Sequence, residues 1–317
     1  MTTPLPKDMH SVLASLWARA QGDHRTDDTL IAPGLYVVAT PIGHLADITV
    51  RALTVLRSVE AIICEDTRRT RILLHAYGLR KRLLSHHAHN QARTTDSLLA
   101  RLRDGQALAL VSDAGMPTIS DPGTHLIAAA QEAGVRVHCV PGASAVTAAA
   151  AVSGLTVDRF VFAGFIPSAR TARRAWLRAL SQEATIALEA PHRLADCLAD
   201  MVELMPARRL AVTRELTKVF EEVAVGPAGA LIDRFPKPKG EVTLVIEAAA
   251  AQAVITQEAL DGAIHKMRVA QPGGSVRDIA ARVAQELAIP RRRAYQRVLA
   301  LSCEGRGAQS ETKKDAE

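Results

Sequence analysis

The stretch ALALVSDAGMPTISDPG, residues 107–123, decides how we interpret the fold. It opens with an apolar run, residues 107–111, which predicts a strand buried on both faces, as in a parallel sheet. The chain then becomes polar at Ser112 and Asp113 and reaches Gly115, which tolerates positive φ. Ligands bind outside the carboxyl ends of strands in open α/β sheets, so this is a candidate binding loop. Taken alone, it is equally well interpreted as a plain strand-to-helix connection.

Other predicted strands end in similar loops. Residues 36–39 run into Pro41-Ile42-Gly43, residues 135–140 into Pro141-Gly142, and residues 61–64 into Glu65-Asp66. Strands and helices alternate here and again after residue 154, so the sequence predicts two α/β domains, the second more mixed in strand direction. The pair Glu65-Asp66 precedes Arg68 and Arg69. This is either a capped helix with surface arginines or an acidic pair beside a patch that meets a polyanion.

The composition excludes several classes of protein. The chain has 317 residues, of which 48% are hydrophobic, and this suggests about two domains with real cores. No apolar run approaches the ~20 residues of a membrane span, and the N-terminus lacks the apolar core of a secretory signal. The four cysteines form no C-x-x-C pair, so we expect a cytoplasmic protein without a zinc cluster. His86, His87 and His89 predict a polar surface rather than a metal site.

Positive charge gathers near the C-terminus. The net charge is +6, and residues 266–306 alone hold nine Lys/Arg and three Asp/Glu, which favours an anionic partner. Two helical patterns there, the second opening with Arg291, Arg292 and Arg293, resemble a helix-turn-helix hairpin. A solvated appendage with a basic face is the alternative. We divide the chain into a disordered leader (residues 1–32), an N-terminal α/β domain (33–153), a C-terminal α/β domain (154–248), a basic helical appendage (249–306) and a disordered tail (307–317).

Eight short motifs occur together in a fixed order. They are VATPIG (residues 38–43), EDTR (65–68), LVSDAG (110–115), SDPG (120–123), PGASA (141–145), PHR (191–193), RELTK (214–218) and KGE (239–241). From about residue 34 to residue 246 the chain therefore resembles the bacterial small-subunit rRNA cytidine 2′-O-methyltransferases, a family of the tetrapyrrole-methylase-like superfamily. His44 stands where the family usually has Asn, and Met116 where it usually has Thr. Neither difference removes a charge.

The resemblance implies two α/β domains of the tetrapyrrole methylase type, a homodimer, and S-adenosylmethionine bound in the cleft between the domains. The residues expected at the cofactor are Pro41, Ser112, Asp113, Ala114, Gly115, Met116, Ser144 and Ala145, with Glu189 from the second domain. The substrate implied is 16S rRNA or the small ribosomal subunit. Arg68, Arg69 and the cluster Arg291, Arg292 and Arg293 are then expected to hold RNA phosphates, with an affinity that falls steeply with salt.

Charged groups at adjacent strand ends suggest how the reaction is catalysed. Methyl transfer from a sulfonium is an in-line displacement, and a ribose 2′-hydroxyl is a poor nucleophile that benefits from a general base. Our hypothesis is that Glu65 or Asp66 is this base and that Lys218 biases the 2′-oxygen toward its anion. Two other functions stay open: a tetrapyrrole C-methyltransferase of the same fold, and a non-catalytic rRNA-binding assembly factor.

Overall fold

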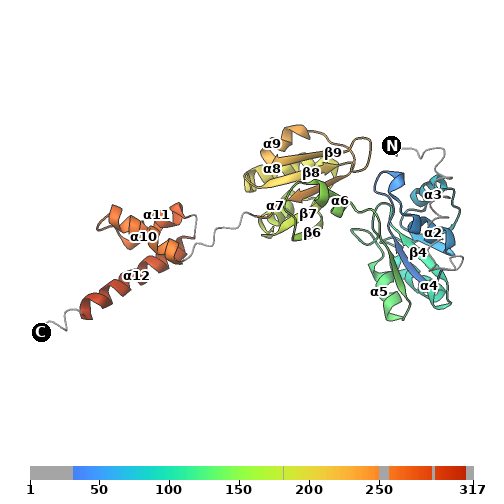
Figure 1. Cartoon of the computed structure of the whole chain (residues 1–317), viewed down its shortest axis with the longest axis horizontal. Coiled ribbons are helices and arrows are strands. Elements are labelled where there is room, and N and C mark those ends of the chain that lie inside the picture. Colours follow the sequence, from blue (N-terminus) through green and yellow to red (C-terminus); the bar gives the residue numbers. More distant parts are fainter. Residues whose placement is uncertain (1–30, 181, 250–256, 288–289, 312–317) are drawn as a thin grey trace. The chain divides into compact units, whose positions relative to one another are not determined.

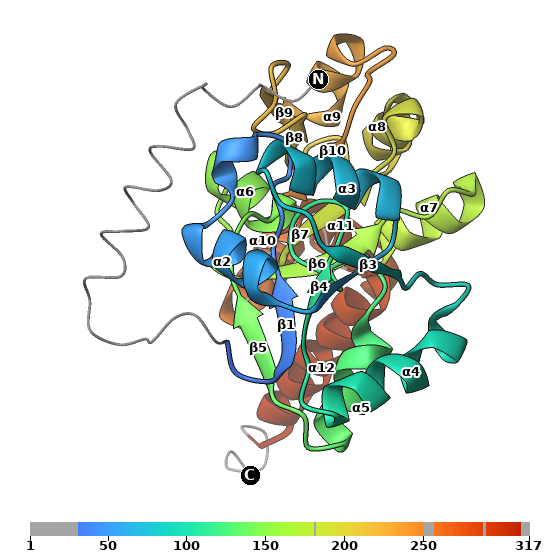
Figure 2. The ribbon, with the colours of Figure 1, turned by 90° about the vertical axis from the view of Figure 1, so that its right-hand side faces the viewer.

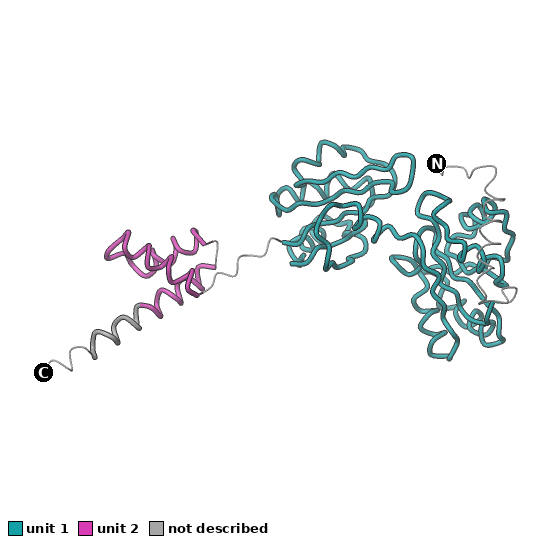
Figure 3. Tube along the Cα trace, viewed as in Figure 1, with its two compact units in different colours: residues 1–249 teal, residues 250–317 magenta. Residues whose placement is uncertain are grey.

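The computed structural model describes residues 31–180, 182–249, 257–287 and 290–311, in two compact units that divide between residues 249 and 250 (Figure 3). The predicted leader falls almost wholly on residues 1–30, which lie outside the described residues, as do residues 312–317 of the predicted tail. Unit 1 contains two five-stranded sheets, and unit 2 is helical. The two α/β domains predicted from the sequence are therefore confirmed, while their boundaries stay predictions.

The first sheet, whose strand β4 is labelled in Figure 1, is parallel throughout and has the order β3-β2-β4-β1-β5. Its elements are β1 (Gly34–Val38), β2 (Ala61–Cys64), β3 (Arg82–Ser85), β4 (Ala107–Val111) and β5 (Val137–Val140), with η1 (Leu45–Asp47), α2 (Val50–Ser58), α3 (Thr67–Ala76), α4 (Gln91–Arg103) and α5 (Thr124–Glu132) between them. The strands β1, β2 and β4 are buried at every residue. This is why they read as continuous apolar runs.

Helices cover both faces of this sheet (Figure 2). Alternate residues of β4 enter different cores: Ala109 packs with α2 and α3, whereas Leu108 and Leu110 pack with α4 and α5. At the carboxyl ends of β1 and β4, Thr40 and Gly115 exchange two backbone hydrogen bonds of 2.9 and 3.0 Å. The chain connections run in opposite directions from these two central strands, so a crevice for ligands is expected there.

The second sheet has the order β6-β7-β10-β8-β9 and mixes parallel and antiparallel pairs. Its elements are α6 (Ala145–Val152), β6 (Phe160–Phe165), α7 (Arg170–Arg178), β7 (Ala184–Glu189), η2 (Pro191–Arg193), α8 (Leu194–Leu204), β8 (Arg209–Arg214), β9 (Glu222–Pro227), α9 (Ala228–Leu231), η3 (Ile232–Arg234) and β10 (Val242–Ile246). One face packs against α7, α8 and α9, and the other against α6. Each sheet of unit 1, with its helices, forms one lobe. The core around α6 includes Ile42, from the loop after β1, and Leu216, from the loop after β8, so it joins the two lobes.

Unit 2 has a hydrophobic core of its own, formed by α10 (Gln257–Ala270), α11 (Val276–Glu286) and α12 (Arg291–Glu311). The side chain of Ser275 caps α11 by accepting a hydrogen bond from the backbone N–H of Asp278. The helix α12 continues beyond residue 301, where the sequence pattern for a helix stops. Among the residues that the structure describes, no helix combines the length and the apolar character needed to cross a bilayer.

Candidate active site

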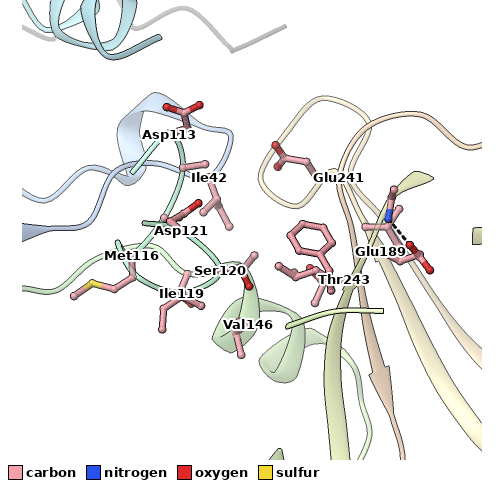
Figure 4. Close-up of a pocket in the computed structure, with 18 of the residues that line it drawn as sticks. Ile42, Asp113, Met116, Ile119, Ser120, Asp121, Val146, Glu189, Glu241 and Thr243 are labelled. Carbon is pink, nitrogen blue, oxygen red and sulfur yellow. Dashed lines mark hydrogen bonds between the residues drawn. The ribbon is translucent and has the colours of Figure 1, made fainter. Parts of the chain in front are cut away.

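A pocket of about 450 Å³ lies at the carboxyl ends of β2 and β4 and is closed on its other side by residues of the second sheet. Asp113, Asp121, Met116 and Ile42 line one wall, and Glu241, Thr243 and Glu189 lie on the opposite side (Figure 4). This volume is in the range of small-molecule sites. We call this cavity the interlobe pocket.

Residues of the β4–α5 loop form much of the first wall. Ala114, Gly115 and Met116 line the interlobe pocket. Two residues of this loop have left-handed backbone conformations, Thr118 with φ 71° and Ser120 with φ 68°. Such conformations cost energy and cluster at ligand sites, where the surrounding packing holds them. The loop is therefore preorganised for a ligand.

The interlobe pocket is acidic. Among the residues that the structure describes, five carboxylates line it, and Arg69 is the one cationic side chain that does so. The carboxylates are Glu65, Asp113, Asp121, Glu189 and Glu241. A cationic ligand fits such a lining, because opposite charges attract strongly where water is partly excluded.

Two carboxylate oxygens in this lining are buried without a hydrogen-bond partner. Asp113 accepts a bond of 3.1 Å from Arg69 through Oδ2, which leaves Oδ1 unpaired. Glu189 pairs with Arg193 at 2.6 Å through Oε1, which leaves Oε2 unpaired. Buried acceptors are nearly always satisfied in proteins, so Oδ1 of Asp113 is suited to accept a hydrogen bond from a ligand, whereas the fully buried carboxylate of Glu189 points away from the cavity (Figure 4).

The sequence analysis did not predict Asp121 as a residue of this site. Burial and the negative charges of Glu65 and Asp113 together raise the pKa of its carboxyl to about 6, although a hydrogen bond with Ser112 acts in the opposite direction. The motif SDPG did mark the loop, but nothing in one sequence says that its carboxylate faces those of two other strand ends. Glu241 was missed in the same way, as part of the motif KGE.

A second, polar hollow of about 490 Å³ adjoins the interlobe pocket and shares Glu65, Arg69 and Asp113 with it. The remaining side chains of this polar hollow are Asp66, Thr67, Arg68, His87 and His89. Two of the histidines noted in the sequence therefore lie beside the predicted arginines. Among the described residues, no group of three His, Cys, Asp or Glu side chains is arranged to hold a metal ion.

Asp66 is engaged in holding the start of α3. Its side chain accepts a hydrogen bond of 2.8 Å from the backbone N–H of Arg68 and forms an ion pair of 2.9 Å with the Arg68 guanidinium. These bonds from Arg68 hold the pKa of the Asp66 carboxyl at about 2. A carboxylate with so low a pKa is a poor general base. The cap that the sequence offered as the alternative interpretation is present.

Lys218 lies behind the wall of the interlobe pocket. Its ammonium forms ion pairs with Glu215 at 2.8 Å and with Glu241 at 3.1 Å. Burial opposes the charged form, but these two partners raise the pKa of Lys218 overall. Lys218 is not a lining residue, and through Glu241 it holds a residue that is.

The predicted cofactor residues divide into two groups. Those that line the interlobe pocket are Asp113, Ala114, Gly115, Met116, Ser144, Ala145 and Glu189. Pro41 and Ser112 are buried beside it rather than exposed to it, and the Ser112 hydroxyl donates a bond of 3.1 Å to the backbone oxygen of Gly115. Arg291, Arg292 and Arg293 are exposed at the start of α12 in unit 2.

Comparisons with known proteins agree with this architecture. Residues 34–232 match the family described as Tetrapyrrole (Corrin/Porphyrin) Methylases. The methyltransferase CobJ, a solved structure, has a TM-score of 0.52 at 19% identity, over 68% of this chain and 95% of that one. At this identity the likeness concerns the fold alone.

Two curated relatives are much more similar in sequence. The ribosomal RNA small subunit methyltransferase I of Mesorhizobium japonicum is 46% identical over 229 residues, 70% of this chain and 78% of the relative. The protein of the same name from Synechocystis is 43% identical over 279 residues, 86% of this chain and 99% of the relative. Since 279 residues exceed the 249 of unit 1, this match extends into unit 2. The chain therefore belongs to the tetrapyrrole (corrin/porphyrin) methylase family and, within it, to the ribosomal RNA small subunit methyltransferases I.

Proposed function

We propose that this protein transfers a methyl group from S-adenosylmethionine to the 2′-oxygen of a cytidine ribose in 16S rRNA. The observation that carries the proposal is the acidic interlobe pocket joined to a polar hollow with two arginines. The first is suited to a small cation and the second to a polyanion. The similarity to methyltransferases named for small-subunit rRNA supports this assignment of substrate.

The interlobe pocket fits S-adenosylmethionine in charge and in donor pattern. This cofactor carries a sulfonium, an ammonium and hydroxyl donors, and it supplies an electrophilic methyl group when bound. The unpaired oxygen of Asp113 is an acceptor for such donors, while Ala114, Gly115 and Met116 line the same cavity. Ser144 and Ala145, at the start of α6, complete the predicted set.

The polar hollow supports an approach of RNA from the side of α3. Arg68 and Arg69 line it together with His87 and His89, and the Arg68 side chain is 84% exposed. Exposed guanidinium groups bind phosphate through paired hydrogen bonds. Unit 2 adds Arg291, Arg292 and Arg293 at the start of α12, and its inclusion in the match to the Synechocystis relative supports a shared role.

The residues of this chain contribute mainly alignment and proton transfer. Holding the acceptor oxygen in line with the methyl group lowers the barrier by several kcal/mol, and a general base adds a factor of roughly 10²–10⁴. Of the two predicted bases, Asp66 is occupied by Arg68, whereas Glu65 lines both cavities. Lys218 was predicted to bias the 2′-oxygen toward its anion. This effect would act at a distance, since Glu215 and Glu241 already neutralise the charge of Lys218.

A homodimer and a cytoplasmic location belong to the same proposal. The edge strand β6 supports the dimer, because Phe160 and Val161 are 40% and 41% exposed, whereas Phe165 at the end of this strand lines the interlobe pocket. An unpaired strand edge with apolar side chains is a surface that a second chain can cover. Sedimentation analysis at micromolar concentration tests this, and a monomer would contradict it. The location follows from the rRNA substrate.

Labelled methyl transfer tests the function directly. Purified protein is incubated with tritiated S-adenosylmethionine and, in parallel, small ribosomal subunits, free 16S rRNA and a porphyrinogen. We expect label in the rRNA and none in the porphyrinogen. Label in the porphyrinogen alone would favour a tetrapyrrole C-methyltransferase. RNA binding without binding of S-adenosylmethionine would favour an assembly factor.

A further inference from the structure

We propose that Asp121 is the catalytic residue that accepts the proton of the attacking hydroxyl, and that Glu65 tunes it. This inference rests on the proposed function, because it assigns a role within methyl transfer to a ribose hydroxyl. It departs from the hypothesis drawn from the sequence, which considers only Glu65 and Asp66.

The backbone on either side of Asp121 is sterically restricted. Ser120 before it has a left-handed backbone conformation with φ 68°. Pro122 after it restricts Asp121 to extended conformations. Gly123 packs so closely on β4 that a Cβ there would lie 2.8 Å from Cδ2 of Leu110. The carboxylate is therefore presented by a backbone with little freedom, as the alignment of a proton acceptor requires.

The ion pairs of the interlobe pocket single out two of its five carboxylates. Asp113 pairs with Arg69, Glu189 with Arg193, and Glu241 with Lys218. In the described part of the chain, Glu65 and Asp121 are the lining carboxylates for which no cationic partner is found within 4.0 Å. A carboxylate held by a cation is a weaker base, so the pairing removes three of the candidates.

Charge repulsion between the two remaining groups favours Asp121 as the acceptor. The groups that act on Asp121 are Glu65 at the end of β2, and Ser112 and Asp113 at the end of β4. Burial and the two negative charges raise its pKa to about 6. A base with a pKa just below the working pH is both ionised and strong enough to take a proton.

The step is balanced without any further reactant. The 2′-oxygen forms the new C–O bond while the C–S bond breaks, and the electron pair of that bond stays on sulfur. The hydroxyl proton moves to the carboxylate of Asp121, which later releases it to water. The positive charge on the donor favours ionised Asp121 before transfer, and its disappearance afterwards lets the carboxyl hold the proton.

Two substitutions separate the roles of the two carboxylates. Asp121→Asn is expected to lower the single-turnover rate by about 10²–10⁴-fold, the usual contribution of a general base. Glu65→Gln removes a negative neighbour, so the acid limb of kcat/KM for the donor moves from about pH 6 to lower pH. Asp104→Asn, at the exposed C-terminal end of α4, is the matched control that leaves rate and profile unchanged.

A second measurement does not depend on turnover. Calorimetry of S-adenosylmethionine binding near pH 6, in buffers of different ionisation enthalpy, counts the protons released. We expect release from the wild-type protein and from Asp104→Asn, and its loss in Asp121→Asn. Circular dichroism confirms that each variant is folded.

Three results would overturn the assignment. One is an Asp121→Asn variant that keeps its rate and its acid limb. Another is an Asp121→Asn variant that loses donor affinity alone, which would make Asp121 a donor ligand. The third is an exchange of roles, in which Glu65→Gln abolishes turnover and Asp121→Asn only moves the profile. If the wild-type protein methylates no RNA, the proposed function fails instead, and the calorimetry still shows whether Asp121 titrates.

Discussion

At the scale of single residues, the site is defined by how each carboxylate is partnered. Glu65 and Asp66 follow β2 and Asp113 follows β4, while Asp121 lies later in the β4–α5 loop, and each of the four has a different environment. The sequence allowed the acidic character of these strand ends to be predicted. It did not allow the partners to be predicted, because the pairing of Arg69 with Asp113 joins positions 44 residues apart.

Asp66 offers a direct test of its capping role. We expect Asp66→Asn to keep most of the methyl transfer activity, because an asparagine also caps a helix. The loss should be far smaller than the roughly 10²–10⁴-fold cost of removing a general base. A folded variant with no activity would contradict this.

Because Asp66 is paired with Arg68, we also expect the stability of the folded protein to depend on pH. Arg68 lowers the pKa of the Asp66 carboxyl in the folded protein to about 2, from its ordinary value of 3.8. The stabilisation is therefore present above pH 4 and is lost as the pH falls toward 2. Denaturation of the wild-type protein and of Asp66→Asn over this range should give curves that converge. A difference that stays constant down to pH 2 would contradict the pairing.

At the scale of elements, the loops that join the two lobes control the geometry of the interlobe pocket. Gly43 lies so close to the loop after β8 that a Cβ would stand 2.6 Å from Oγ1 of Thr217 and 2.9 Å from the backbone oxygen of Leu216. The backbone N–H of His44 donates a bond of 3.0 Å to that same Oγ1. A methyl group at Gly43 must therefore displace the second lobe.

We expect Gly43→Ala to weaken binding of S-adenosylmethionine and to lower the melting temperature. Gly262→Ala in α10 is the control, since nothing lies within 4 Å of its added Cβ, and alanine favours a helix by about 1 kcal/mol over glycine. Titration calorimetry and thermal melting measure both effects. Unchanged donor affinity in Gly43→Ala would show that the contact between lobes does not shape the interlobe pocket.

A buried ion network joins α7 to α8. Asp200 forms ion pairs with Arg170, Arg173 and Arg174, and Arg173 is only 4% exposed. Asp200→Ala leaves the Arg173 charge buried and unpaired, which costs about 3–5 kcal/mol. Glu203→Ala, which removes a half-exposed partner of Arg174, should cost at most about 1 kcal/mol. Urea denaturation distinguishes the two, and equal losses would contradict the role of burial.

The elements that could be predicted are those whose burial leaves an apolar run. β2 and β4 have the predicted bounds, because both are buried along their whole length. β3 was not predicted as a sheet strand, since it is a half-exposed edge strand with a charged residue at its start. The burial of Arg173 could not be predicted, because its partner Asp200 lies on another helix, 27 positions away in the sequence.

At the scale of the whole molecule, the protein has a donor pocket in unit 1 and basic surfaces in both units. Replacing Arg291, Arg292 and Arg293 with alanine should weaken RNA binding and reduce the slope of log affinity against log salt by about 2–3, since each lost phosphate contact contributes roughly 0.7–0.9. Affinity for S-adenosylmethionine should not change. Filter binding over a range of salt concentrations measures this, and an unchanged slope would remove α12 from the RNA surface.

Methyl transfer to a cytidine 2′-oxygen is best tested by identifying the nucleoside that carries the methyl group. Small subunits or 16S rRNA are treated with the protein and labelled S-adenosylmethionine, digested to nucleosides and separated by mass spectrometry. We expect label in 2′-O-methylcytidine, and we expect this label to be lost with Asp121→Asn. Label on a base, or no label in RNA while a porphyrinogen is methylated, would contradict this expectation.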